Sequence, residues 1–176
     1  MAVAVASIPI VMYPILKKIN PSMALGYFAG RLVEGIMFTV GTICMLALLF
    51  LSKGAVQTFA VDTVWTQLSL TLLSIRSAES VFAQFTFSLG SLMFYYMLYK
   101  AELIPRWLAG WSLIGALLFL ASAFLVIFGL DSGSSLYLGL NAPGGLGEMV
   151  FALWLIIKGF NSSAITSADS TVEKSQ

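Results

Sequence analysis

Residues 24–52 form an apolar stretch that holds only two charged side chains, Arg31 and Glu34. A helix crosses the hydrocarbon core of a bilayer with about 20 residues, because the core is about 30 Å thick and each residue rises about 1.5 Å. Backbone polar groups in lipid must be paired within the protein, which a continuous helix achieves by itself. The stretch therefore predicts a membrane-spanning helix with a cation and an anion inside it.

The rest of the chain agrees with a membrane protein. Of its 176 residues, 59% are hydrophobic and 10% are charged, with a mean hydropathy of +0.95, whereas soluble domains are about 45–50% apolar and about 25% charged. We predict an all-α, polytopic transmembrane helix bundle that forms one domain over residues 1–160. Its expected spans are the apolar runs 2–16, 24–52, 80–99, 107–130 and 143–158.

Two segments are not predicted to span. In residues 58–78, apolar side chains recur at helical spacing with polar ones between them, which is typical of an amphipathic helix lying at the membrane surface. The alternative for this segment is a sixth, polar span. Residues 161–176 are polar, and we expect them to form a disordered cytoplasmic tail.

The basic residues predict the orientation. Connections on one side of the bilayer and the end of the last span carry Lys17, Lys18, Lys100, Arg106 and Lys158. Cytoplasmic connections of membrane proteins are enriched in Lys and Arg. We therefore predict a multi-pass protein of the plasma membrane with its C-terminus in the cytoplasm. Arg76 and Glu79 then fall at the outer face, where we expect a solvated pair.

Three motifs resemble the bacterial membrane proteins of the domain of unknown function 4386 family. They are GRLVEG at 30–35, FSLGSLMFYYMLYKAELIPRWLAGWSLIGALL at 87–118 and GLGEMVFALWLIIKGFN at 145–161. The resemblance covers most of residues 17–161. Members look like six-helix proteins, which implies that this chain lacks the first span. The resemblance implies a membrane-embedded helical fold and no particular activity.

Arg31, Glu34 and Glu148 are the candidate site residues with a charge. Arg31 and Glu34 are three residues apart and can pair along a helix. Gly26, Gly30 and Gly41 lie near the same helical face as Glu34, and small residues let a second helix approach closely. Glu148 lies at a comparable depth in the last span, so Arg31 could bridge both carboxylates. Two carboxylates and one guanidinium require a further cation or a bound proton for neutrality.

A polar stripe on the third span supplies the other candidate site residues. Ser80, Gln84, Ser88, Ser91 and Tyr95 step along one side of a helix at intervals of three or four residues. Stripes of hydroxyl and amide groups line internal cavities or form hydrogen bonds between helices.

Several kinds of chemistry are excluded or unsupported by the sequence. The chain has no histidine and a single cysteine, Cys44, so the commonest general base and transition-metal ligand is missing. We expect no metal site and no cofactor. A net charge of +1 gives no field that would attract nucleic acid.

These patterns leave three functions open. The first is binding or transport of a small polar or anionic ligand, or of protons, at Arg31, Glu34, Glu148, Gln84, Ser88, Ser91 and Tyr95. The second is a structural or regulatory membrane subunit, in which the charged cluster is a helix-packing clamp and the glycine-lined faces join copies into a homo-oligomer. The third is an intramembrane enzyme with Glu34 or Glu148 as acid/base, which lacks support from a nucleophile–base pair. The lipid bilayer is the partner common to all three.

Overall fold

The computed structural model describes residues 2–58 and 63–161. Within these ranges the chain forms five α-helices and no strand: α1 Ala2–Leu16, α2 Pro21–Thr58, α3 Thr63–Lys100, α4 Arg106–Ile127 and α5 Ser135–Ile157. Helices α2 to α5 are long and apolar enough to cross a membrane, and α1 is a shorter apolar helix. The predicted fold class is confirmed, with four such helices and the shorter α1 where five spans were predicted.

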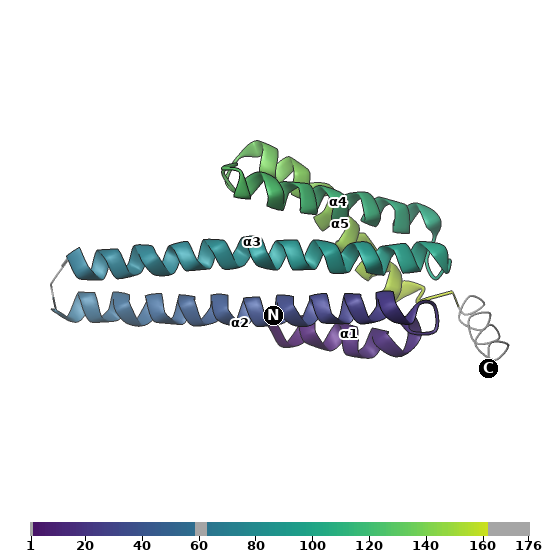
Figure 1. The fold of residues 1–176 in the computed structure, drawn as a ribbon, viewed down its shortest axis with the longest axis horizontal. Helices are drawn as coiled ribbons and strands as arrows, with labels where there is room; N and C mark the ends of the chain where they lie inside the picture. The colour runs from purple at the N-terminus through teal and green to yellow at the C-terminus, as the bar shows by residue number, and fades with distance from the viewer. Residues whose placement is uncertain (1, 59–62, 162–176) are drawn as a thin grey trace.

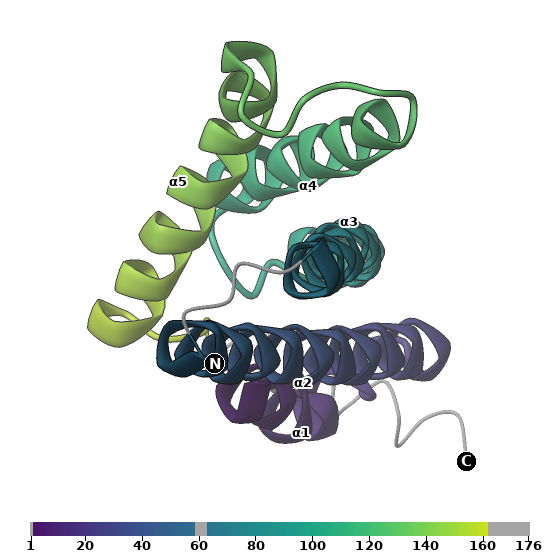
Figure 2. The ribbon, with the colours of Figure 1, turned by 90° about the vertical axis from the view of Figure 1, so that its left-hand side faces the viewer.

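The long helices α2 and α3 form an antiparallel hairpin that runs the length of the molecule (Figure 1). Each has 38 residues, which is about 57 Å of helix. Helix α1 packs against α2, while α4 packs against the other side of α3 and α5 packs against α4 (Figure 2). Helices α1 to α4 therefore form layers in sequence order, and α5 runs obliquely across the side of α4 and α3 (Figure 2). Residues between α3 and its neighbours on both sides are buried.

Local signals explain where two helices begin. The Asn20 side chain accepts a hydrogen bond of 3.1 Å from the Met23 backbone N–H. Asn20 therefore caps α2 just before Pro21, and both residue types are favoured at these positions of a helix. The Ser134 hydroxyl accepts a hydrogen bond from the Tyr137 N–H and caps α5 in the same way. The Asp131 side chain accepts from the Gly133 N–H and closes the turn before it.

The predicted break between a surface helix at 58–78 and a span at 80–99 does not occur. Residues 63–100 form one continuous helix, α3, and residues 59–62 lie outside the described part of the chain. The serine and threonine hydroxyls that suggested a separate helix donate to carbonyls of their own helix, as Thr71 does to Gln67, Ser74 to Leu70 and Ser77 to Leu73. With no Gly or Pro before Gly90, nothing interrupts it.

Helix α5 begins earlier than predicted, at Ser135 instead of residue 143. Asn141, which the predicted start at residue 143 leaves in a connection, lies inside the helix. The Asn141 side chain donates a 2.7 Å hydrogen bond to the Tyr137 carbonyl, within its own helix. Pro143 has no N–H to donate, and its own carbonyl accepts a hydrogen bond from the Trp111 indole. Residues 162–176, most of the predicted tail, lie outside the described residues.

One end of the bundle combines the main hydrophobic core with most of its basic residues. The α1–α2 turn, the α3–α4 turn and the end of α5 meet there (Figure 1). Buried side chains from α1, α2, α3 and α4 pack together at this end, including Leu16, Leu98, Leu103 and Leu108. We call this the basic end, because Lys17, Lys18, Lys100, Arg106 and Lys158 lie in or beside these segments.

Candidate functional site

Glycines on α2 place Arg31 and Glu34 inside the protein. A Cβ atom added at Gly30 would lie 3.5 Å from the Gly90 Cα atom and 3.4 Å from the Thr86 carbonyl oxygen. The α2 and α3 backbones therefore approach closely at this level. Arg31 and Glu34 are 8% and 4% exposed. The expectation that this pair faces protein instead of lipid agrees with their burial.

The Arg31 guanidinium is held by one ion pair and two aromatic rings. Its Nη1 atom donates to Glu34 Oε2 at 3.1 Å. The guanidinium carbon lies 4.7 Å from the centre of the Phe87 ring and 5.7 Å from that of Tyr27. Contact with aromatic faces stabilises a cation that has left water. The planar group is thus fixed between α2 and α3.

Glu148 reaches the same region from α5. The Tyr95 hydroxyl donates a 2.8 Å hydrogen bond to Glu148 Oε1, which joins α3 to α5. Arg31 and Glu34 both lie within electrostatic range of Glu148. The predicted bridge from Arg31 to both carboxylates is not formed, because Arg31 donates its hydrogen bond to Glu34. Its attraction to Glu148 acts through space.

Glu148 borders a narrow internal space between α3, α4 and α5. The lining residues are Phe87, Ser91, Tyr95, Ser112, Ala116, Phe119, Gly144 and Glu148. As the helices stand, this space is too narrow for a water molecule. We refer to Tyr27, Arg31, Glu34, Ser91, Tyr95, Ser112 and Glu148 as the inner polar cluster.

The inner polar cluster has unused hydrogen-bonding capacity. Among the described residues, four of its buried polar atoms have no hydrogen-bond partner: Tyr27 Oη, Arg31 Nε, Ser91 Oγ and Ser112 Oγ. The Tyr27 and Ser112 hydroxyls lie beside Arg31 and Tyr95, but without the geometry of a hydrogen bond. Buried polar groups without partners are rare in folded proteins, and each calls for an explanation.

Gln84 forms a separate and fully bonded network. Its Nε2 atom shares two hydrogens among three acceptors, the Phe119 carbonyl, Ser122 Oγ and Asn141 Oδ1, at 3.1, 2.6 and 3.0 Å. Its Oε1 atom accepts from the Tyr137 hydroxyl at 2.8 Å. We call these four side chains, Gln84, Ser122, Tyr137 and Asn141, the Gln84 network. It ties α3, α4 and α5 together.

The predicted stripe on α3 therefore divides into four parts. Ser91 and Tyr95 belong to the inner polar cluster, and Gln84 belongs to its own network. Ser88 belongs to neither, because its hydroxyl donates to the Gln84 carbonyl within α3. Ser80 lines a cavity of about 270 Å³ near the α4–α5 turn, together with Gln84 and Tyr137 of the Gln84 network, Arg76 and four other residues.

The sequence analysis missed five functional candidates: Tyr27, Ser112, Ser122, Tyr137 and Asn141. Asn141 carried the best available signal, an amide in a mainly apolar segment, but the predicted start of the last span at residue 143 left it in a connection. Ser122 and Ser112 are small hydroxyls in an apolar helix, where such residues commonly bond to their own backbone. Their roles depend on which α3 residues they face.

A second charged pair, Arg76 and Glu79, differs from its prediction. Arg76 Nη1 and Glu79 Oε2 lie 2.5 Å apart, but Glu79 is only 5% exposed, so the pair is not solvated as a whole. Gly41 of α2 makes the room, because a side chain there would collide with the Glu79 carboxylate. The buried carboxylate thus faces α2, and the close α2–α3 contact continues to this level.

The glycine-lined faces are used within the chain. Gly30 packs on α3, and Gly115 of α4 faces Gly144 of α5, whose Cα atom would lie 2.6 Å from an added Gly115 Cβ. A homo-oligomer formed through these faces would compete with the fold itself. In residues 2–58 and 63–161, no group of three or more potential metal ligands comes together.

Residues 1–159, nearly the whole chain, match the family described as "Domain of unknown function (DUF4386)". The chain belongs to the DUF4386 family. This confirms the resemblance seen in the three sequence motifs. Curated proteins and solved structures gave no match. Together with its apolar helices, family membership makes the chain an integral membrane protein of a family without an assigned activity.

Proposed function

We propose that this DUF4386 protein binds and exchanges protons, or a small polar ligand, at the inner polar cluster. The observation that carries the proposal is the set of four unpartnered buried polar atoms around Arg31 and Glu148. A cluster that served only to hold helices together gains most when every polar atom is bonded. The Gln84 network meets that condition, and the inner polar cluster does not.

The charges favour a proton or a cationic group over an anion. Arg31 supplies one positive charge against two carboxylates, Glu34 and Glu148, and within residues 2–58 and 63–161 no other charged side chain interacts with Arg31. An anion would add to the carboxylate excess in a medium of low dielectric constant. A proton removes the excess and needs no additional space, whereas a larger ligand requires the helices to separate.

The contacts assign different roles to the two carboxylates. Glu34 is the direct counter-ion of Arg31 at 3.1 Å, and a buried ion pair that loses one partner leaves a costly charge. Glu148 is bonded to a neutral group, the Tyr95 hydroxyl, and borders the narrow space with Ser91 and Ser112. We therefore assign Glu148 as the exchanging group and Tyr95 as the residue that orients it.

A structural or regulatory subunit is the second candidate function. The fully bonded Gln84 network and the glycine contacts between neighbouring helices favour it. Both features stabilise one arrangement of α2 to α5 and need no ligand. In this alternative, the inner polar cluster is a clamp, and neutralising Glu148 affects only stability.

For either function we propose the plasma membrane as the location, with the basic end in the cytoplasm. In the described part of the chain, this end has five basic side chains and one acidic one, Glu102. The opposite end has two basic side chains, Lys53 and Arg76, and two acidic ones, Glu79 and Asp131. The difference follows the distribution expected from the positive-inside rule, which supports our proposal that the end of α5 lies on the cytoplasmic side.

Proton flux into liposomes tests the proposal. The full chain is reconstituted into vesicles that contain a pH-sensitive dye, and a pH step is applied across the membrane. We expect wild-type vesicles to equilibrate faster than protein-free vesicles, Glu148→Gln vesicles to equilibrate at the protein-free rate, and Glu102→Gln vesicles to match wild type. Glu102 is the control because it is exposed and pairs with Arg106. Wild-type vesicles no faster than empty ones, or an unaffected Glu148→Gln variant, would contradict proton exchange across the membrane.

A further inference from the structure

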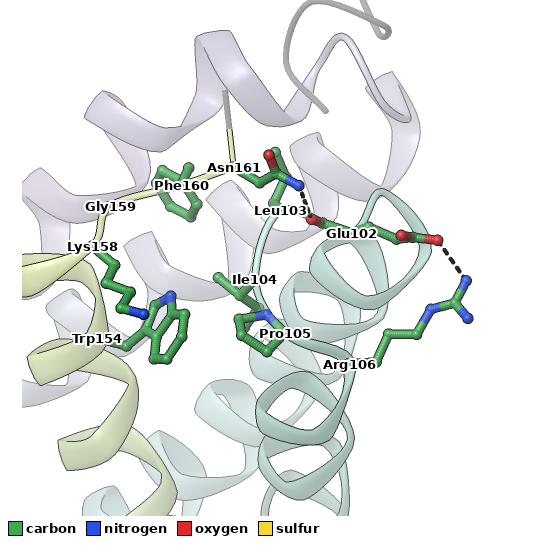
Figure 3. Close-up of a pocket in the computed structure, with 10 residues that line it drawn as sticks. All are labelled: Glu102, Leu103, Ile104, Pro105, Arg106, Trp154, Lys158, Gly159, Phe160 and Asn161. Atoms are coloured by element: carbon green, nitrogen blue, oxygen red, sulfur yellow. Dashed lines mark hydrogen bonds and ion pairs between the residues drawn. The ribbon is translucent and has the colours of Figure 1, made fainter. Parts of the chain in front are cut away.

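The basic end contains a pocket separate from the inner polar cluster. It lies where the α3–α4 turn meets the chain that follows α5, and it has a volume of about 380 Å³. Figure 3 shows its lining residues, which are Glu102, Leu103, Ile104, Pro105, Arg106, Trp154, Lys158, Gly159, Phe160 and Asn161. The size is within the range of small-molecule sites in proteins.

Hydrogen bonds connect the two walls of the pocket. The Asn161 backbone N–H donates to the Leu103 carbonyl at 3.0 Å, and its side chain donates to the Glu102 carbonyl at 3.5 Å. Both turns use left-handed backbone, with φ of +54° at Glu102 and +68° at Gly159. A non-glycine residue in this region costs energy, and the contacts with Asn161 help to hold it. The pocket is therefore part of the fold and not a gap beside a loose end.

Lys158 gives this pocket a positive charge that no acidic side chain in residues 2–58 and 63–161 pairs with. Its ammonium nitrogen lies 5.0 Å from the centre of the Trp154 ring, a contact that positions the cation. No carboxylate in the described part of the chain pairs with it. The acidic residue of the pocket, Glu102, is engaged by Arg106 at 2.5 Å, and Figure 3 shows that pair at the edge away from Lys158.

Apolar surface adjoins the charged pocket. The Trp107 and Trp154 rings pack edge to face, with centroids 6.4 Å apart, and Trp107 and Ile157 are exposed. Tryptophan is enriched at the boundary between headgroups and hydrocarbon, since its ring is apolar and its N–H is polar. A cation in a pocket at this boundary, beside a surface that faces lipid, matches the two parts of an amphipathic ligand.

We propose that this pocket binds the phosphate headgroup of an anionic phospholipid. Lys158 contacts the phosphate as a point charge, and Trp154 holds the lysine in place. The acyl chains lie along the apolar surface that includes Trp107 and Ile157. The site is independent of the proposed proton exchange, because none of its residues belongs to the inner polar cluster. Binding at this pocket would attach the protein to the anionic leaflet, in addition to the general electrostatic attraction between the basic end and anionic lipids.

Quenching of tryptophan fluorescence by brominated lipids tests the site. The full chain is reconstituted in phosphatidylcholine vesicles with increasing fractions of dibrominated phosphatidylglycerol, and the same series is repeated with dibrominated phosphatidylcholine. The ratio of the two relative binding constants measures the preference for the anionic headgroup. We expect wild type to prefer phosphatidylglycerol. We expect Lys158→Gln to lower the preference about fivefold, corresponding to about 1 kcal/mol for one basic residue at an anionic surface.

Three controls distinguish this site from general attraction. Lys158→Arg keeps the charge and should keep most of the preference, which excludes misfolding as the cause of a loss. Lys53→Gln, at the opposite end of α2, should leave the preference unchanged. Millimolar inorganic phosphate should fail to remove the preference, whereas its full removal would identify a free-anion site and overturn the lipid assignment. Equal binding of both lipids by wild type, or an unchanged preference in Lys158→Gln, would also overturn it.

Discussion

Ser88 and Ser91 form a matched pair for testing whether the inner polar cluster has spare hydrogen-bonding capacity. Both lie on α3, and they are 0% and 1% exposed. The Ser88 hydroxyl donates a 2.7 Å hydrogen bond to the Gln84 carbonyl. The Ser91 hydroxyl has no partner among the described residues. The same substitution at both positions therefore isolates the effect of the hydrogen bond.

We expect Ser91→Ala to be more stable than Ser88→Ala by about 2–4 kcal/mol. Alanine gives both variants the same gain in helix propensity, which cancels in the comparison. Ser88→Ala then loses one intrahelical hydrogen bond, about 0.6 kcal/mol in membrane proteins. Ser91→Ala removes a buried group without a partner, which relieves a desolvation penalty of about 1–3 kcal/mol.

Equilibrium unfolding of the purified protein in mixed detergent micelles measures both free energies. In the flux assay, Ser91→Ala should conduct more slowly than wild type, since it removes a polar group beside Glu148, and Ser88→Ala should not. If Ser91→Ala is the less stable variant, the Ser91 hydroxyl has a structural partner, and the reasoning about spare capacity is refuted.

The remaining predictions concern packing and the two carboxylates. Gly115→Ala should lower the free energy of unfolding by about 1–3 kcal/mol, because its Cβ would meet the α5 backbone. Gly110→Ala, whose Cβ would have no atom within 4 Å, should raise it by up to about 1 kcal/mol. Equal effects of the two substitutions on unfolding in micelles would contradict the close α4–α5 contact. Gln84→Leu should cost about 2 kcal/mol by the same measurement, at about 0.6 kcal/mol for each of its hydrogen bonds, and a neutral effect would disprove the Gln84 network. Glu34→Gln should lower the free energy of unfolding by about 3–5 kcal/mol, because it leaves Arg31 buried without a counter-ion. Glu148→Gln keeps an acceptor for the Tyr95 hydroxyl and should lower it by less than about 1 kcal/mol. A similar large loss of stability in both variants would favour the structural clamp.

The sequence could predict features that depend on a single helix. Asn20 before Pro21 is a complete local signal for a helix start, and α2 begins there. Glycines at helical spacing around Arg31 and Glu34 indicated a face that packs on protein, and the burial of both residues agrees. These predictions needed only the geometry of one helix.

Features that depend on how two helices pack against each other could not be predicted from the sequence. The burial of Glu79 requires Gly41 to lie opposite it, which follows only from the register of α2 against α3. The residues around Asn141 are of types common in turns, but Asn141 lies inside α5. There its side chain accepts hydrogen bonds from Gln84 of α3 and Ser122 of α4. The separation of Ser88 from Ser91 has the same origin, since both are serines on one polar stripe.

Infrared difference spectroscopy tests most directly whether Glu148, and not Glu34, is the exchanging carboxyl group. Spectra of the reconstituted full chain are recorded while the surrounding buffer is made more acidic, and the C=O band of newly protonated carboxyl groups is followed. We predict a component of this band that is lost in Glu148→Gln, is kept in Glu34→Gln and shifts when the buffer is changed to D₂O. A membrane-embedded carboxyl band that is lost only in Glu34→Gln, or one that does not exchange with D₂O, would contradict the proposed role of Glu148.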